Sequence, residues 1–284
     1  MTVIAARIAR RRVANVVFEA FCWLITAVAL LALAAILWTL LQKGLVGLNL
    51  DVFTRSTPAA GSRGGLLNAI AGSAMMCVLA MVSSVVIGVL AGTWLAEYGG
   101  NSVYGSVIRF LNDVLLSAPS ILVGVFIAEI LVTHVIHHFS GLAGIAALSL
   151  LAIPVIVRTT EDVLRLQAQT LREAGMALGA HFSFVIRKIL WRAARSGLLT
   201  GGLLAFARIS GETAPLLFTA LNNQFFSLDL TQPTANLPVV IFNFALSAYD
   251  DLRRLAWAGA LLVTAAVLAI TIVARVVAGE PKRS

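Results

Sequence analysis

An arginine and a glutamate lie near the middle of a segment that is otherwise apolar or small. Arg208 and Glu212 belong to the run GLLTGGLLAFARISGETAPLLFTAL at residues 197–221, which is long enough to cross a lipid bilayer. A charge at the centre of a transmembrane helix costs roughly 3 kcal/mol, so such a residue is expected to face protein or water rather than lipid. The i, i+4 spacing puts both side chains on one helix face, where they can form an ion pair.

Small polar residues and a proline surround this charged pair. Pro215 has no N–H to donate to the carbonyl of Gly211, so the helix is expected to loosen there. With Ser210 and Thr213, the two charged residues form a polar, kinked segment, and irregular backbone in a membrane is tolerated where it lines protein or water. Two interpretations stay open: a structural ion pair that holds this helix to a neighbour, or part of a substrate pathway.

The pathway interpretation favours an anionic substrate. The planar guanidinium of Arg208 matches the oxygens of phosphate or carboxylate through two parallel hydrogen bonds. Glu212 would neutralise the arginine when the pathway is empty. Its carboxylate would also accept a hydrogen bond from a protonated anion and repel an anion that has no proton, which favours hydrogen phosphate over sulfate.

The composition is that of a polytopic membrane protein. Of the 284 residues, 60% are hydrophobic and only 12% are charged, which leaves more apolar surface than a soluble domain could bury. The net charge of +8 does not indicate nucleic-acid binding, because the basic residues cluster at the ends of apolar runs. Cys22 and Cys77 lie inside apolar runs, so we expect no disulfide. No catalytic site, cofactor or metal is predicted.

The hydropathy pattern predicts an all-α fold with six transmembrane helices. Residues 1–63 would hold an N-terminal tail, the first span and an external loop, and residues 64–284 a core of five spans. The predicted spans are 18–41, 67–96, 112–136, 141–158, 197–221 and 255–277.

The distribution of basic residues predicts the orientation. If the N-terminus is cytoplasmic, fifteen of the 21 Lys and Arg residues fall on the cytoplasmic side and five outside, and Arg208 lies within a span. The positive-inside rule therefore predicts a protein of the plasma membrane with both termini in the cytoplasm.

The longest cytoplasmic segment, residues 159–196, is charged and amphipathic. Apolar residues recur at helical spacing with charges between them, which predicts amphipathic helices with a break near Gly179. One interpretation is a basic segment that lies on anionic membrane lipid.

A motif in this segment supports another interpretation. Glu173, Ala174 and Gly175, followed by Gly179 and Ile189, resemble the EAA loop of ABC importer permeases, although Gly175 stands where the family has Ala, and Trp191-Arg192 where it has Leu-Pro. In that family the motif forms a coupling helix that sits in a cleft of the ATPase subunit. The chain has no GxxxxGK[ST] motif, so ATP would be bound by a partner chain.

Further motifs resemble one branch of that family, the PstA-type permease of phosphate-specific ABC importers. The stretch ARISGETAPLLFTALNNQF is similar to it, as are GGLLNAIAGS at 64–73, LAEYGG at 95–100, LLSAPSILVGVF at 115–126 and AIPVIVRTTEDVLRL at 152–166. The resemblance covers about residues 64–277 and implies an ABC importer type I permease core.

The resemblance also implies partners and functional residues. The chain would pair with a second, homologous permease as a heterodimer, with an ATP-binding subunit dimer below and an extracytoplasmic phosphate-binding protein above. The two arginines linked to phosphate passage in the family correspond to Arg208 and Arg158, and the acid of the same motif to Glu212. From the residues alone, Arg158 is equally explained as an anchor at the cytoplasmic face, with Pro154 one turn away to aim it inward.

Two rival functions remain open from the sequence. One is an ABC permease for another oxyanion such as sulfate. The other is an ion-coupled secondary anion transporter with Glu212 as its proton site, although no internal repeat is visible and the charged segment 159–196 would then lack a role.

Some smaller features have a structural interpretation. The pairs Gly88/Gly92 and Gly197/Gly201 are spaced for close helix packing. Asp113 and Glu129 could line the pathway, or each could pair with an arginine. The histidines at 134, 137 and 138 are expected to form a polar helix end rather than a metal site, because no Asp, Glu or Cys lies near them in the turn.

Overall fold

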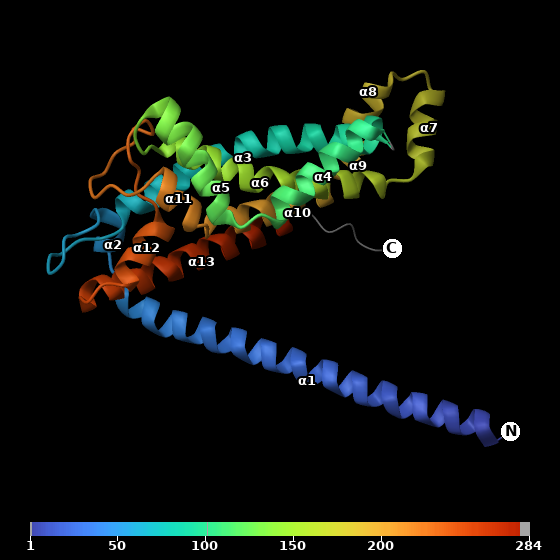
Figure 1. Cartoon of the computed structure of the whole chain (residues 1–284), viewed down its shortest axis with the longest axis horizontal. Helices are drawn as coiled ribbons and strands as arrows, with labels where there is room; N and C mark the ends of the chain where they lie inside the picture. Colours follow the sequence, from blue (N-terminus) through green and yellow to red (C-terminus); the bar gives the residue numbers. More distant parts are fainter. Residues whose placement is uncertain (1, 101, 279–284) are drawn as a thin grey trace.

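The computed structural model describes residues 2–100 and 102–278, and within them the chain forms helices and loops but no strand (Figure 1). The C-terminal tail at 279–284, which the charge pattern assigns to the cytoplasm, lies outside the described residues. In the described part of the chain, four uninterrupted helices have the length and composition of membrane spans. They are α1 (Thr2–Gly47), α3 (Leu67–Trp94) with its π-helical extension η1 (Leu95–Gly99), α6 (Gly141–Arg165) and α13 (Asp250–Ala278).

The helix α6 lies at the centre of the bundle, and glycines bring its neighbours close. A Cβ on Gly88 of α3 would lie 2.8 Å from Ile156, and one on Gly92 would lie 2.6 Å from the carbonyl oxygen of Val157. On the other side, a Cβ on Gly201 of α10 (Arg195–Ser210) would overlap the hydroxyl of Thr159. The predicted packing role of both glycine pairs is confirmed, and α6 continues seven residues past the predicted end of its span.

The predicted span 112–136 is wrong as a single helix. It is divided into α4 (Val103–Ser117), α5 (Ser120–Ile127) and the π-helical segment η2 (Ala128–Ile136), and the two halves are bent by 105°. Ala118 is extended, with φ −65° and ψ 135°, because the following Pro119 disfavours helical backbone in the residue before it.

The predicted span 197–221 is also interrupted. Helix α10 ends at Ser210, and α11 (Ala214–Thr219) begins after a break of three residues, with Pro215 in its first turn. The loosening predicted at Gly211 is thus confirmed as a break. The six predicted spans correspond to four continuous helices, one bent pair and this interrupted segment.

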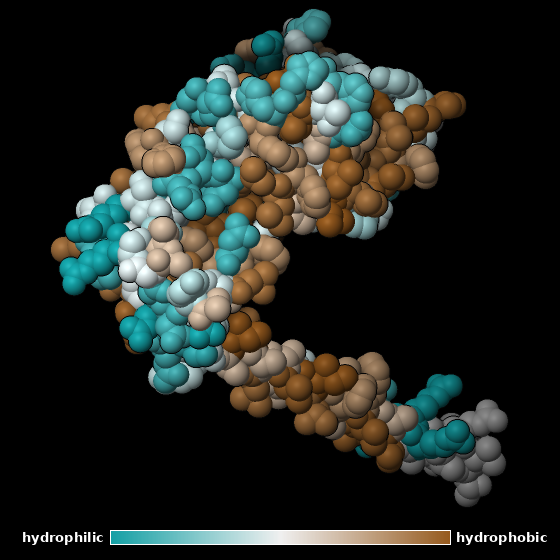
Figure 2. Space-filling model, turned by 60° about the vertical axis from the view of Figure 1, so that its left-hand side comes forward, coloured by the Kyte–Doolittle hydropathy of each residue, from teal (hydrophilic) through white to brown (hydrophobic). Residues whose placement is uncertain are grey.

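Helix α1 stands apart from the bundle and touches it mainly through α13 (Figure 1). The contact lies near the C-terminal end of α1, where Gly44 packs on Leu261, Gly47 on the backbone of Arg254, and the ammonium of Lys43 lies 4.9 Å from the ring centre of Trp257. None of the most apolar part of α1 is buried. Figure 2 shows it as an apolar arm separated from the bundle by an open gap.

The charged segment 159–196 forms short helices after the end of α6, as predicted. They are α7 (Gln169–Ala177), α8 (Phe182–Phe184), the π-helical η3 (Val185–Leu190) and α9 (Trp191–Ala193). The break lies at Gly179, whose φ of +78° is in the left-handed region that favours glycine. Leu164, Val185, Ile186, Leu190 and Ala194 form the buried core of this end of the molecule.

The opposite end is formed by α2 (Asp51–Thr54), α11, α12 (Leu237–Ala245) and the loops between them (Figure 1). Its apolar core joins Val52, Leu66, Leu237 and Val240. Buried Asn68 ties three segments together, since its amide donates to the Thr57 hydroxyl at 2.9 Å and to the Asn223 carbonyl at 2.7 Å.

Candidate functional site

Arg208 and Glu212 lie on the two sides of the helix break. Arg208 is in the last turn of α10, and Glu212 follows Gly211, which has left the helix with φ −105° and ψ 1°. Both side chains are partly buried. Among the ion pairs of the described residues, none joins Arg208 to Glu212, although the sequence suggested one. The i, i+4 pairing needs a continuous helix, and the break removes it.

The structure separates Ser210 from Arg208. Residues two apart on an α-helix are turned by about 200°, so the two side chains leave α10 on nearly opposite sides. The Ser210 hydroxyl donates to the Phe206 carbonyl at 2.6 Å and lines an apolar groove of about 380 Å³ with Cys77 and residues of α13. Thr213 lies in the break itself, next to Glu212.

The two broken segments of the bundle meet each other. Helix α5 follows the break at Pro119, α11 follows the break at Gly211, and the two helices pack together. At their contact a Cβ on Gly124 would lie 2.5 Å from the Cα of Pro215. Non-helical backbone at membrane depth is tolerated where it is enclosed by protein or lines a water-filled cavity, and discontinuous helices often form substrate sites in transporters.

Arg158 lies on α6 between two carboxylates. Its Nη1 is 3.8 Å from Oδ1 of Asp113 on α4, and its Nε is 3.2 Å from Oδ2 of Asp162. About half of each of these side chains is exposed. The alternative in which Asp113 pairs with an arginine is therefore confirmed. Helix α4 is also held to α6 beside this pair, because the amide of Asn112 donates to the Pro154 carbonyl at 3.2 Å.

Arg158 and Arg208 lie at two levels of the same bundle. Thr159, next to Arg158, packs against Gly201 of α10. Arg208 is seven residues further along α10, which at 1.5 Å per residue is about 10 Å closer to the opposite end of the molecule.

Some of the EAA-like residues are exposed on the surface of α7, and others are packed beneath it. Glu173 and Ala174 of α7 are exposed, and Gly175 is buried. A Cβ on Gly175 would lie 2.8 Å from Val185 and 3.1 Å from Ile189, which explains why Gly replaces the family's Ala. Ile189 thus supports the helix from beneath, and α7 presents Glu173 and Ala174 outward.

Two buried acidic residues escaped the sequence analysis. Oε1 of Glu161 on α6 is 2.7 Å from Nε of Arg109 on α4 and 2.8 Å from Nη2 of Arg165, and the glutamate is only 3% exposed. Glu97 in η1 pairs with Arg172 of α7. The positive-inside rule considers only the basic residues at these helix ends, whereas an acidic residue among them is the signal of a buried ion pair.

The three histidines end the η2 segment without forming a metal site. Nδ1 of each lies 2.7–3.0 Å from a backbone carbonyl oxygen nearby, that of Glu129, Thr133 or Phe139. No group of three or more His, Cys, Asp or Glu side chains in the described part of the chain could hold a metal ion.

Comparison with known proteins identifies the family. Residues 84–279 match the family described as the binding-protein-dependent transport system inner membrane component. The chain belongs to this family. A Haemophilus influenzae protein described as phosphate transport system permease protein PstA is 51% identical over 265 residues, which cover 93% of this chain and 94% of the relative. A Yersinia pestis protein of the same description is 52% identical, over 87% of this chain and 84% of the relative.

A solved structure shares the fold of this family member. Superposition with a chain of the MetNI methionine ABC transporter, in an inward-facing conformation, gives a TM-score of 0.62 at 18% sequence identity. The match covers 75% of this chain and 94% of the other. This inner membrane component is therefore an all-α, multi-pass protein with the fold of an ABC importer permease.

Proposed function

We propose that the chain is the membrane-spanning permease subunit of an ATP-driven importer that moves inorganic phosphate into the cytoplasm by alternating access. The observation that carries the proposal is the position of Arg208 at a helix break inside the bundle, in a chain about half identical to phosphate transport permeases. A cation beside unwound backbone offers an anion a charge and free hydrogen-bonding groups together.

The substrate pathway is proposed to pass Arg208, Glu212 and Thr213 at the break and then Arg158. Arg208 attracts the anion through charge-assisted hydrogen bonds. Glu212 accepts the proton of hydrogen phosphate. At Arg158 the anion exchanges places with the carboxylates of Asp113 and Asp162, which hold the guanidinium while the pathway is empty. Ser210 belongs to this region of the chain but faces an apolar groove, so we give it no contact with the anion.

The energy source is proposed to be a dimer of a separate ATP-binding subunit that docks on α7. The exposed residues Glu173 and Ala174 form the docking surface, Gly175 and Ile189 support it, and Gly179 lets the chain turn back after the helix. The chain itself carries no P-loop motif.

A second, homologous permease is proposed to complete the membrane part. Helix α1 leaves most of its length without a neighbour from this chain, which is consistent with a place for the partner. An extracytoplasmic phosphate-binding protein would dock at the end formed by α2, α11 and α12.

The proposed orientation, with the N-terminus in the cytoplasm, is supported by the arrangement of the ends. The N-terminal end of α1 points to the same end of the molecule as α7 and α8 (Figure 1). If α7 meets a cytoplasmic ATPase, the N-terminus is cytoplasmic too, in agreement with the positive-inside bias.

The test is radiolabelled phosphate uptake by cells that lack their own importer but contain its other subunits. We expect Arg208→Gln to abolish uptake while the chain still co-purifies with the ATPase. Arg187→Gln is the matched control, because Arg187 is an exposed arginine outside the predicted spans and far from the helix break in sequence. Uptake that survives in Arg208→Gln would refute a pathway through this residue. Competition by sulfate equal to that by phosphate would favour another oxyanion as substrate.

A further inference from the structure

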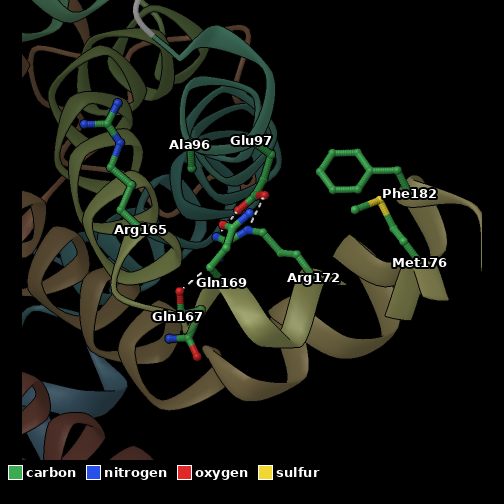
Figure 3. Close-up of a pocket in the computed structure, with 8 residues that line it drawn as sticks. All are labelled: Ala96, Glu97, Arg165, Gln167, Gln169, Arg172, Met176 and Phe182. Carbon is green, nitrogen blue, oxygen red and sulfur yellow. Dashed lines mark hydrogen bonds and ion pairs between the residues drawn. The ribbon is translucent and has the colours of Figure 1, made fainter. Parts of the chain in front are cut away.

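Arg172 of α7 forms a bidentate ion pair with Glu97 of η1 (Figure 3). Its Nε lies 2.8 Å from Oε2 and its Nη2 lies 2.6 Å from Oε1 of the carboxylate. The same guanidinium donates to the carbonyls of Gln167 and Leu164, each at 2.9 Å. The side chains are 11% and 2% exposed. The hydrogen bond to Glu97 raises the pKa of Arg172, so the guanidinium keeps its charge at any physiological pH.

The contact crosses a groove. A hollow of about 720 Å³ separates η1 from the start of α7, and its lining includes Ala96, Gln169, Met176 and Phe182 as well as the pair. In Figure 3 the side chain of Arg172 reaches across this space to Glu97, and the guanidinium of Arg165, another lining residue, lies apart from the pair. The hydrogen bonds between Arg172 and Glu97 therefore join α7 to η1 across the groove.

Two other contacts join the same short stretch of α3 and η1 to the coupling segment. Nε1 of Trp191 donates to the Thr93 hydroxyl at 3.1 Å, and the rings of Tyr98 and Phe182 meet edge to face with centroids 5.5 Å apart. Helices α7, α8 and α9 are thus each attached to residues 93–98. Of the three attachments, only that of Arg172 starts from α7 itself.

The stretch 93–98 is connected in turn to the other helices that line the pathway. Arg109 of α4 donates to the Leu95 carbonyl at 3.1 Å and to Glu161 of α6 at 2.7 Å. Helix α3 packs along α6 and reaches the opposite end of the molecule, where the Ser73 hydroxyl accepts from the N–H of Leu237. A displacement of η1 would therefore move α3, α4 and α6 together.

We propose that Arg172 and Glu97 are positioning residues that transmit the movement of α7 to α3, and through Arg109 to α4 and α6. The inference rests on the proposed function, since it takes α7 to be the element that the ATPase moves. A pair that only stabilised the fold would lower the amount of assembled complex. A pair that transmits movement changes how much phosphate is carried for each ATP hydrolysed, in complexes that are assembled.

The test uses the complete complex in proteoliposomes with the binding protein inside or outside as its orientation requires. Phosphate uptake and ATP hydrolysis are measured on the same samples, and their ratio is compared for wild type, Arg172→Gln, Glu97→Gln and the charge reversal Arg172→Glu with Glu97→Arg. Arg187→Gln is the control, because Arg187 is an exposed arginine of the same segment whose guanidinium donates to a carbonyl of its own helical turn.

In both single variants we expect the amount of phosphate carried per ATP hydrolysed to fall about tenfold, while the ATPase stays bound. A change of this size is usual for energetic coupling between distant sites. The charge reversal should recover part of the loss, and Arg187→Gln should match wild type. An unchanged ratio in the single variants would overturn the inference.

If a single variant does not assemble, Arg172→Lys tests the inference instead, because it keeps the positive charge and loses the bidentate hydrogen bonds to Glu97. Its ratio should fall as well, and a wild-type ratio in this variant would overturn the inference. A wild-type complex that carries no phosphate would instead overturn the proposed function, and the inference with it.

Discussion

Arg158 on α6 faces Asp113 on α4, with 3.8 Å between Nη1 and Oδ1. The pair joins the C-terminal half of the central helix α6 to α4, the first helix of the bent pair, and Asp162 holds the same guanidinium from one turn further along α6. The arginine that we propose for the anion pathway is thus held by two protein carboxylates in this conformation.

The first prediction concerns the ion pair between Arg158 and Asp113. Asp113→Asn removes one competitor for Arg158, so the anion should leave it more slowly. We expect phosphate uptake at saturating substrate to fall by up to about fivefold, since half-exposed pairs contribute up to about 1 kcal/mol. Initial uptake rates check this, with Asp250→Asn at the surface pair of α13 as control. A rate equal to wild type would show that Asp113 does not compete with the substrate.

The second prediction compares two acids that are adjacent in the sequence. Glu161 is 3% exposed and holds two arginines, whereas the Asp162 side chain is 55% exposed. Glu161→Gln leaves Arg109, whose side chain is 19% exposed, without its buried partner and should lower the free energy of unfolding by about 3 kcal/mol. Asp162→Asn should change it by less than about 1 kcal/mol. Thermal unfolding in detergent measures both, and equal shifts would contradict the burial of Glu161.

The third prediction uses adjacent glycines of α10. A Cβ at Gly201 would overlap the Thr159 hydroxyl, whereas a Cβ at Gly202 meets nothing within 4 Å. Gly201→Ala should therefore force α10 away from α6 and destabilise the protein by about 1–3 kcal/mol. Gly202→Ala should be neutral or slightly stabilising, because alanine favours the helix. A lower unfolding temperature for both variants alike would refute the close contact.

The fourth prediction tests the turn after α7. Gly179 has φ +78° and open space around it, so a side chain there is strained by its backbone alone. Gly179→Ala should cost about 1–2 kcal/mol and reduce co-purification of the ATPase, whereas Gly179→Asn should cost less. Matching behaviour of the two variants would mean that the left-handed conformation is not what the site requires.

The sequence predicted those parts of the fold that depend on nearby residues. The break before Pro215, the turn at Gly179 and the glycine packing of α3 and α10 all follow from the identity of one or two residues. The bend at Pro119 was missed because the apolar run continues through it, and hydropathy does not register a change of direction. The pair of Arg172 with Glu97 joins residues 75 positions apart, and no local pattern records such a contact.

The pairing of α1 with α13 has a consequence for how the protein is made. Helix α1 is synthesised long before α13, the element on which Gly44 and Gly47 pack. Throughout translation of the intervening residues, α1 lies in the bilayer without α13, and lipid is its main neighbour. Its apolar surface on all sides suits this delay, and its small residues keep the docking position clear until the last helix arrives.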